Sequence, residues 1–257
     1  MERLLSAVLL WLSCLVATAA VPAPDVLENT KPYDSRGTVL PLDTEVIGHD
    51  GVSQALRQWM PEDKPIVLTF NYMGCAMLCS LQQEGLSRTL RGMELKSGES
   101  FSVVSVSIDH EETPEMAERA SARLSDQISG KWTVVTASET SIAALTKAAG
   151  FRFEYVKASD QFAHPAVTYV LTPEGKVSQY FAGLDTAPRD MKLALIEASQ
   201  GRIGSFIDQV TLACLQYDLS ANAYVAKGVM RTGGLTILAG LGLFLGLLWR
   251  REWIGRS

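Results

Sequence analysis

The sequence predicts an α/β domain with a mixed central sheet, placed between an export signal and a C-terminal membrane helix. Apolar runs rich in β-branched residues alternate with amphipathic patterns in the order strand, helix, strand, helix, strand, helix, hairpin, helix. The closing hairpin makes part of the sheet antiparallel. Long apolar segments without charges lie near both ends of the chain.

Five short segments have the composition of buried strands and are bounded by turn residues. They are 65–72 (PIVLTFNY), 101–108 (FSVVSVSI), 133–135 (TVV), 166–171 (AVTYVL) and 176–181 (KVSQYF). Thr172-Pro173-Glu174-Gly175 joins the last two, with Pro and Gly at positions typical of a tight turn. This turn predicts the antiparallel hairpin.

Helical patterns fill the intervals between the strands and follow the hairpin. Thr113 and Pro114 are suited to the N-cap and to the first helical position of one helix, and Gly150 is suited to end another. The expected helices cover 81–95, 113–124, 138–149 and 189–199.

The two ends of the chain predict export and anchoring. Residues 1–20 combine Arg3, an apolar stretch and small residues for cleavage, which is the pattern of a signal peptide. Cys14 lies inside this segment and is expected to leave with it. Residues 232–249 are 18 residues without a charge, about 27 Å of helix and enough to span a bilayer. Arginines follow this segment, so the C-terminus is expected in the cytoplasm.

The expected organisation follows from these ends. It comprises a signal peptide (1–20), a linker (21–39), the α/β domain (40–200), a juxtamembrane segment (201–228), one transmembrane helix (229–250) and a cytoplasmic tail (251–257). We expect a single-pass protein of the cytoplasmic (inner) membrane, with its soluble domain on the extracytoplasmic or periplasmic side. Gly242 and Gly246 have a GxxxG spacing, which makes a homodimer through the membrane helix a further expectation.

Charge and cysteine content narrow the function classes. With 23 basic and 28 acidic residues, and no basic run outside the membrane flanks, the chain is not expected to bind nucleic acid. The mature cysteines would be Cys75, Cys79 and Cys214, an odd number, so one is left over after any pairing. Cys214 is either a buried thiol, a partner for one of the other two, or a link between chains.

Cys75 and Cys79 follow the first core strand and begin the next helix. Open α/β sheets place their sites at the carboxyl ends of strands, and a helix N-terminus lowers the pKa of a thiol. A Cys75–Cys79 disulfide is geometrically allowed but closes a short loop and would stabilise little. This position therefore favours redox or metal chemistry. We treat Met77, between the two cysteines, as a packing residue.

Of the three histidines, His164 has the most informative place. In a thioredoxin-like sheet the loop that enters the strand 166–171 faces the cysteine turn, and an X-Pro bond there is often cis, which Pro165 could provide. His164 would then sit over Cys75 and Cys79. Two thiolates and one imidazole form a soft three-ligand set suited to copper, Cu(I) or Cu(II); structural zinc is the competing metal but needs a fourth ligand.

The chain resembles the Sco/SenC family of copper-binding proteins with a thioredoxin-like fold. The resemblance is carried by TFNYMGCAMLC, VVSVSIDHEETPEMA and AHPAVTYVLTPEGKVSQYFAG, and by the spacing of 85 residues from Cys79 to His164. It covers residues 40 to about 215 and is closest to the bacterial branch with a C-terminal membrane helix. Ala76 and Ser80 stand where many members have proline.

The resemblance implies that Cys75, Cys79 and His164 are copper ligands in a metallochaperone that matures the copper site of cytochrome c oxidase subunit II or another exported copper protein. A copper donor and thiol reductants would be further partners. The alternative is a thiol–disulfide oxidoreductase in which Cys75 and Cys79 are the catalytic redox pair. A third alternative, a peroxide-reducing relative of this fold, lacks a recognisable activating arginine.

Overall fold

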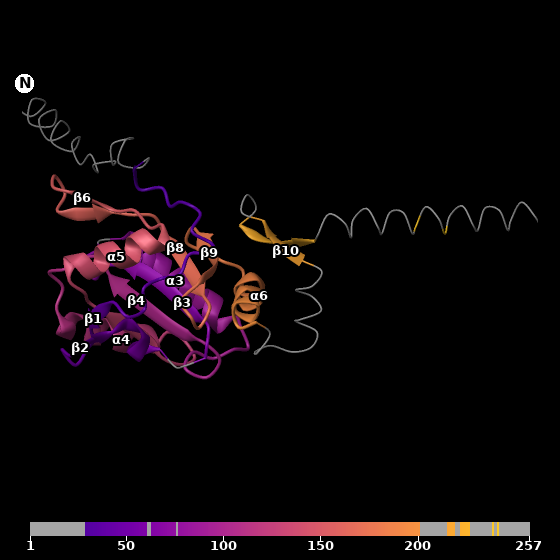
Figure 1. Ribbon diagram of the computed structural model, residues 1–257, viewed down its shortest axis with the longest axis horizontal. Helices are drawn as coiled ribbons and strands as arrows, with labels where there is room; N and C mark the ends of the chain where they lie inside the picture. The colour runs from indigo at the N-terminus through magenta and orange to yellow at the C-terminus, as the bar shows by residue number, and fades with distance from the viewer. Residues whose placement is uncertain are drawn as a thin grey trace, which may run out of the picture.

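The central element of the computed structural model is a five-stranded mixed sheet with the strand order β5-β4-β3-β8-β9 (Figure 1). The structure describes residues 29–60, 63–75, 77–200, 215–218 and 222–226, and the single residues 238 and 241. The strands β3 (Ile66–Asn71), β4 (Ser102–Ser107) and β5 (Trp132–Val135) are parallel. β8 (Val167–Leu171) runs antiparallel to β3, and β9 (Val177–Ala182) runs antiparallel to β8. The predicted mixed α/β class is confirmed, and each of the five predicted strands is in this sheet.

The predicted helices are present with shifted ends. They are α3 (Leu78–Arg91), α4 (Pro114–Ser125), α5 (Glu139–Ala149) and α6 (Pro188–Ala198). Thr113 caps α4 by accepting a hydrogen bond from the backbone N–H of Met116, and Pro114 occupies the first turn. Gly150 ends α5 in the left-handed conformation, with φ of 70°. α3 begins three residues earlier than expected, so its N-terminus lies between the two cysteines of the motif.

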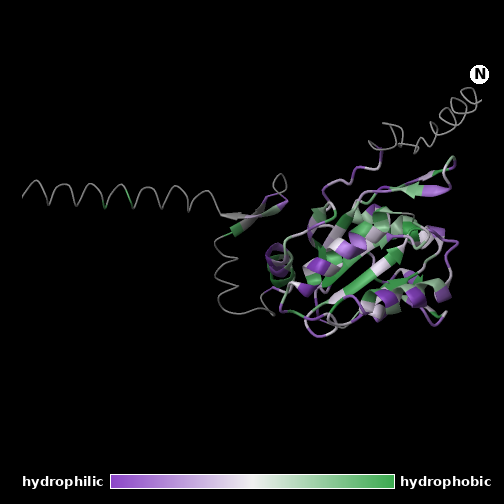
Figure 2. Cartoon of the chain, turned by 180° about the vertical axis from the view of Figure 1, so that it is seen from behind, coloured by the Kyte–Doolittle hydropathy of each residue, from purple (hydrophilic) through white to green (hydrophobic). Residues whose placement is uncertain are grey.

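Side chains that alternate along the strands build two cores, one on each face of the sheet. Leu68 and Phe70 of β3 face α5 and the segment before β3, whereas Val67 faces α3, α4 and α6. Every residue of β3 and β4 is buried, which explains their nearly continuous apolar runs. Figure 2 shows the central strands largely in the hydrophobic colour, while the helices carry hydrophilic residues on their outer sides.

Smaller elements surround the sheet, and the sequence did not predict them. Two hairpins are formed by β1 (Glu45–Ile47) with β2 (Ser53–Ala55), and by β6 (Glu154–Val156) with β7 (Gln161–Ala163). The short helix η1 (Leu56–Trp59) follows β2, and β10 (Leu215–Asp218) pairs with β11 (Ala223–Ala226). These strands are three or four residues long, too short for a clear alternation of apolar and polar side chains.

The segment before the sheet is held against the domain from Tyr33 onward. The Tyr33 hydroxyl donates to the Lys147 carbonyl at 2.5 Å, and the Ser35 hydroxyl donates to the Ala149 carbonyl at 2.6 Å. Among the described residues, no helix has the length and apolar character needed to cross a membrane. The predicted signal peptide (1–20), Cys14, Cys214 and nearly all of the predicted transmembrane helix (229–250) lie outside the described residues.

Candidate metal centre

The antiparallel pairing of β3 with β8 brings the cysteine turn and His164 together. β3 ends at Asn71, and Cys75 lies in the turn between that end and α3. Because β8 runs in the opposite direction, its first residues lie beside the last residues of β3, with Thr168 opposite Thr69. His164, three residues before β8, therefore reaches the cysteine turn across 85 residues of sequence.

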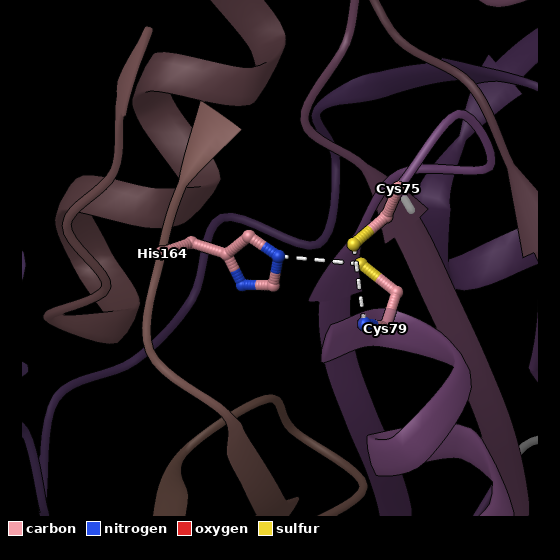
Figure 3. A group of neighbouring side chains, drawn as sticks. All are labelled: Cys75, Cys79 and His164. Atoms are coloured by element: carbon pink, nitrogen blue, oxygen red, sulfur yellow. Dashed lines mark hydrogen bonds between the residues drawn. The ribbon is translucent and has the colours of Figure 1, made fainter. Parts of the chain in front are cut away.

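Cys75, Cys79 and His164 converge (Figure 3). The Nε2 atom of His164 lies 3.2 Å from the Sγ atom of Cys79, and the backbone N–H of Cys79 donates to the Sγ atom of Cys75 at 3.2 Å. All potential ligand atoms lie within 4.8 Å of one another, and no other such group of His, Cys, Asp or Glu exists in the described part of the chain. Both thiols are free.

Burial differs sharply between the three side chains. Cys79 is 2% exposed and His164 is 7% exposed, whereas Cys75 is partly exposed. The Nδ1 atom of His164 lies 3.1 Å from the carbonyl oxygen of Pro165. A proton on Nδ1 would make this contact a hydrogen bond and would leave the Nε2 lone pair available to a metal ion.

Glu112 anchors the turn that carries Cys75. Its Oε1 atom accepts the backbone N–H groups of Met73 and Gly74, the latter at 2.9 Å, and its Oε2 atom accepts the Ser107 hydroxyl at 2.6 Å. The side chain is buried, and this burial raises the pKa of the Glu112 carboxyl. Sequence reasoning missed Glu112, because in HEETP it resembles any exposed acid before a helix.

Tyr72 connects the cysteine turn to the β6–β7 hairpin that leads to His164. Its hydroxyl donates to the Oε1 atom of Gln161 at 2.7 Å and accepts the backbone N–H of Phe162 at 3.3 Å. The rings of Tyr72 and Phe151 each lie 5.9 Å from the His164 ring. These contacts enclose the imidazole in an aromatic wall and fix its orientation. Burial, and then the negative charge of Cys75, raise the pKa of the Tyr72 hydroxyl.

A groove of about 1180 Å³ opens beside the site. Its aromatic lining includes Tyr72 and Phe151, whose rings contact the His164 ring, and Phe162, whose ring contacts Tyr72. Asp109 and Glu111 also lie along it. The metal centre therefore lies next to a concave surface that is lined by aromatic and acidic side chains.

The sequence around these three side chains matches one protein family. The sequence model of the SCO1/SenC family matches residues 45–197, which include all three converging side chains. The chain belongs to the SCO1/SenC family. No match was found among curated proteins.

Solved structures related to this SCO1/SenC protein share its fold. Two structures from Aquifex aeolicus VF5 are 27% and 25% identical, with TM-scores of 0.55 and 0.53. They cover 63% and 65% of this chain and 94% and 99% of their own chains. The structure of Arabidopsis thaliana ScoI with copper bound is 16% identical, with a TM-score of 0.51, covering 65% of this chain and 99% of that one.

The two thiols of this SCO1/SenC protein have opposite acidities. Hydrogen bonding by the Cys79 thiol is the main cause that lowers the pKa of Cys75 to about 3; His164 and the backbone N–H groups of Cys79 and Met77 act in the same direction, and burial opposes them. The same hydrogen bond and burial raise the pKa of Cys79, and the charge of Cys75 adds to this effect. The reduced pair thus carries one thiolate, on Cys75, and one proton, on Cys79.

Two sequence-based expectations about this turn need correction, and the open question of the bond before Pro165 is answered. Cys75 precedes α3 and only Cys79 lies within its first turn, so the two cysteines do not both begin the helix; the backbone N–H of Cys79 donates to the Cys75 sulfur atom across this boundary. Met77 is not a packing residue, because it stands at the N-cap position of α3 with 67% of its surface exposed. The peptide bond before Pro165 is trans, since the described residues contain no cis bond.

The other two histidines lie away from this SCO1/SenC centre. His110 is exposed, and the His49 ring contacts the Trp59 ring at 5.5 Å. Neither is in the candidate ligand group.

Proposed function

We propose that this SCO1/SenC protein binds one copper ion through Cys75, Cys79 and His164 and delivers it to an exported copper protein, with cytochrome c oxidase subunit II as the expected recipient. The observation that carries this proposal is the convergence of two thiol sulfur atoms and one imidazole nitrogen in a mostly buried group. Family membership supports it, and so does one structure of the same fold, that of Arabidopsis thaliana ScoI with copper bound.

The donor set favours copper over structural zinc. Thiolate and imidazole are soft or borderline ligands that suit Cu(I), and Cu(I) accepts three ligands. Structural zinc is almost always held by four protein ligands, and the described residues supply only three to this group. Cys75 is ready as a thiolate, so loading requires only the loss of the Cys79 proton.

The experiment is copper binding by the reduced protein, with total metal analysis, Cu(I) competition against a chromophoric chelator, and Cu(II) absorption and EPR spectra. His164→Ala should weaken Cu(I) binding by at least about 100-fold, because losing a ligand costs more than losing a second-sphere partner. His110→Ala is the matched control, since it removes an exposed histidine close to the groove. Equal copper affinity in the wild type and in His164→Ala would refute the three-ligand site.

The acidity of Cys75 favours a second candidate function, thiol–disulfide exchange. The partly exposed Cys75 thiolate would attack a disulfide of the partner, forming a mixed disulfide and releasing one partner thiolate. Cys79 would then lose its proton and attack Cys75, forming the Cys75–Cys79 disulfide and releasing the second partner thiol. Two electrons pass to the partner, and His164 is not required. A wild-type exchange rate in His164→Ala, together with no copper binding in the wild type, would establish this function.

Anchoring is part of the proposal. The apolar segment 229–250, placed behind an export signal at 1–20, would hold the domain on the extracytoplasmic face of the cytoplasmic membrane, where exported copper proteins are assembled. Ending the chain after residue 228 should move the protein from the membrane to the soluble extracytoplasmic fraction. Retention of this shortened chain in the membrane would contradict the assignment.

A further inference from the structure

Access to the proposed copper site is limited to one side. Cys79 and His164 are 2% and 7% exposed, and His164 is enclosed by the Tyr72 and Phe151 rings. Cys75 is the only one of the three with substantial exposure. Copper that enters or leaves must therefore pass Cys75, and a group beside Cys75 can take part in the exchange of ligands.

Met77 is the group beside that entrance. It is the N-cap residue of α3, two residues after Cys75. Its carbonyl oxygen accepts the N–H of Leu81 at 3.1 Å, so its backbone is held by the helix. Its side chain, in contrast, is 67% exposed. The backbone thus fixes where the thioether is attached, and the three rotatable bonds of methionine let the sulfur atom move.

The exposure of Met77 is not explained by packing. A large apolar side chain gains little stability when most of its surface stays in water. Thioether sulfur is, however, a soft ligand that selects Cu(I), and it needs no deprotonation. Met77 offers an exposed thioether two residues from the Cys75 thiolate, on the accessible side of the proposed copper site. This combination is suited to ligand exchange.

We propose that the Sδ atom of Met77 is a transfer ligand that holds Cu(I) transiently as the metal passes between a donor or recipient and Cys75. This inference rests on the proposed copper function and adds a step to it. On loading, a copper–Met77 sulfur bond forms as one copper–donor bond breaks. The Cys75 thiolate then binds copper and displaces the thioether. Cys79 loses its proton and binds next, with the Nε2 atom of His164. Copper remains Cu(I) throughout, and release is the reverse sequence.

The chemistry gives the transfer a direction. A thiolate is charged and a thioether is neutral, so Cu(I) is held more tightly by Cys75 than by Met77 and moves inward once it reaches the site. Met77 should therefore affect the rates of capture and release by similar factors and leave the resident three-ligand site unchanged. A residue that merely packs against the site would not show this combination.

The test measures copper exchange by stopped-flow absorbance, with Cu(I) supplied as its bathocuproine disulfonate complex and, for release, with excess chelator added to the loaded protein. Met77→Leu keeps an apolar side chain of similar volume and removes the sulfur atom. Leu81→Ala is the matched control, since Leu81 lies one turn along α3, is 41% exposed and offers no ligand. Circular dichroism checks that all three proteins are folded.

We expect Met77→Leu to slow both capture and release about tenfold, equivalent to about 1.4 kcal/mol in the exchange barrier, with the same Cu(I) affinity. Leu81→Ala should exchange copper at the wild-type rate. Wild-type rates in Met77→Leu would overturn the inference. Equal slowing in both variants would also overturn it, because the two side chains would then act as an apolar docking surface. A wild type that binds no copper would instead defeat the proposed function.

Discussion

Replacing Glu112 should loosen the turn that carries Cys75, and the structure sets the size of the effect. In Glu112→Ala, the N–H groups of Met73 and Gly74 lose their common acceptor. A donor left without a partner costs about 1–3 kcal/mol when it is buried; these two bonds are only partly buried, so we expect a loss of about 2–3 kcal/mol in the free energy of unfolding. Glu112→Gln keeps an oxygen for both donors. It should cost about 1 kcal/mol, since hydrogen bonds to a charged acceptor are roughly twice as strong as neutral ones.

The assay is urea unfolding of the reduced, metal-free protein, followed by circular dichroism. Glu111→Ala is the control, because Glu111 is the adjacent acid and is exposed. The alkylation rate of Cys75 provides a second readout at the site itself, and it should change more in Glu112→Ala than in Glu112→Gln. If Glu112→Ala unfolds at the same urea concentration as Glu111→Ala, the buried hydrogen bonds of Glu112 do not anchor the turn and the reasoning fails.

Three further predictions follow from described contacts. Because the pKa of Cys75 is about 3, its alkylation by iodoacetamide in the reduced protein should be nearly constant from pH 5 to 8; a tenfold rise per pH unit would show an ordinary thiol. Gly85→Ala should lower the free energy of unfolding by about 1–3 kcal/mol, because an added Cβ would lie 1.9 Å from the Leu184 carbonyl oxygen; a wild-type urea midpoint would contradict this packing. Trp132→Phe removes a buried hydrogen bond of 2.8 Å to the Ser105 hydroxyl and leaves a void, so it should cost about 2–3 kcal/mol, and an unchanged midpoint would count against that bond.

Most of the sheet could be predicted because β3, β4, β5 and β8 are buried on both faces. The residues of β3 and β4 are apolar or small at nearly every position, so their composition marks them without any knowledge of the neighbours. The helices could be predicted from caps such as Thr113 and Gly150, whose roles depend only on the local backbone. The β6–β7 hairpin could not, because its short strands are partly exposed and are stabilised by contacts with Tyr72.

Some residues of the metal centre could likewise be predicted from the sequence, and others could not. Cys75 and Cys79 were found from their place after a strand, and His164 from the expected order of strands. Glu112 was missed because its burial depends on Met73 and Gly74, 39 and 38 residues away, and no local pattern reports such a contact. The packing role expected for Met77 was wrong for a related reason. The residue stands at the start of α3, which begins at Leu78, and its side chain is exposed there.

The separation of 85 positions between Cys79 and His164 also has a consequence for biogenesis. At about 5–20 residues per second, a ribosome needs roughly 4–17 s to add His164 after Cys79. During that interval the nascent chain carries the two thiols without the imidazole and without the pairing of β8 with β3. Neither half of the centre can be finished locally, because closure awaits a long-range strand pairing, a slow type of folding step. Completion of the ligand set therefore coincides with completion of the sheet, and a truncated or misfolded chain presents only a bare dithiol.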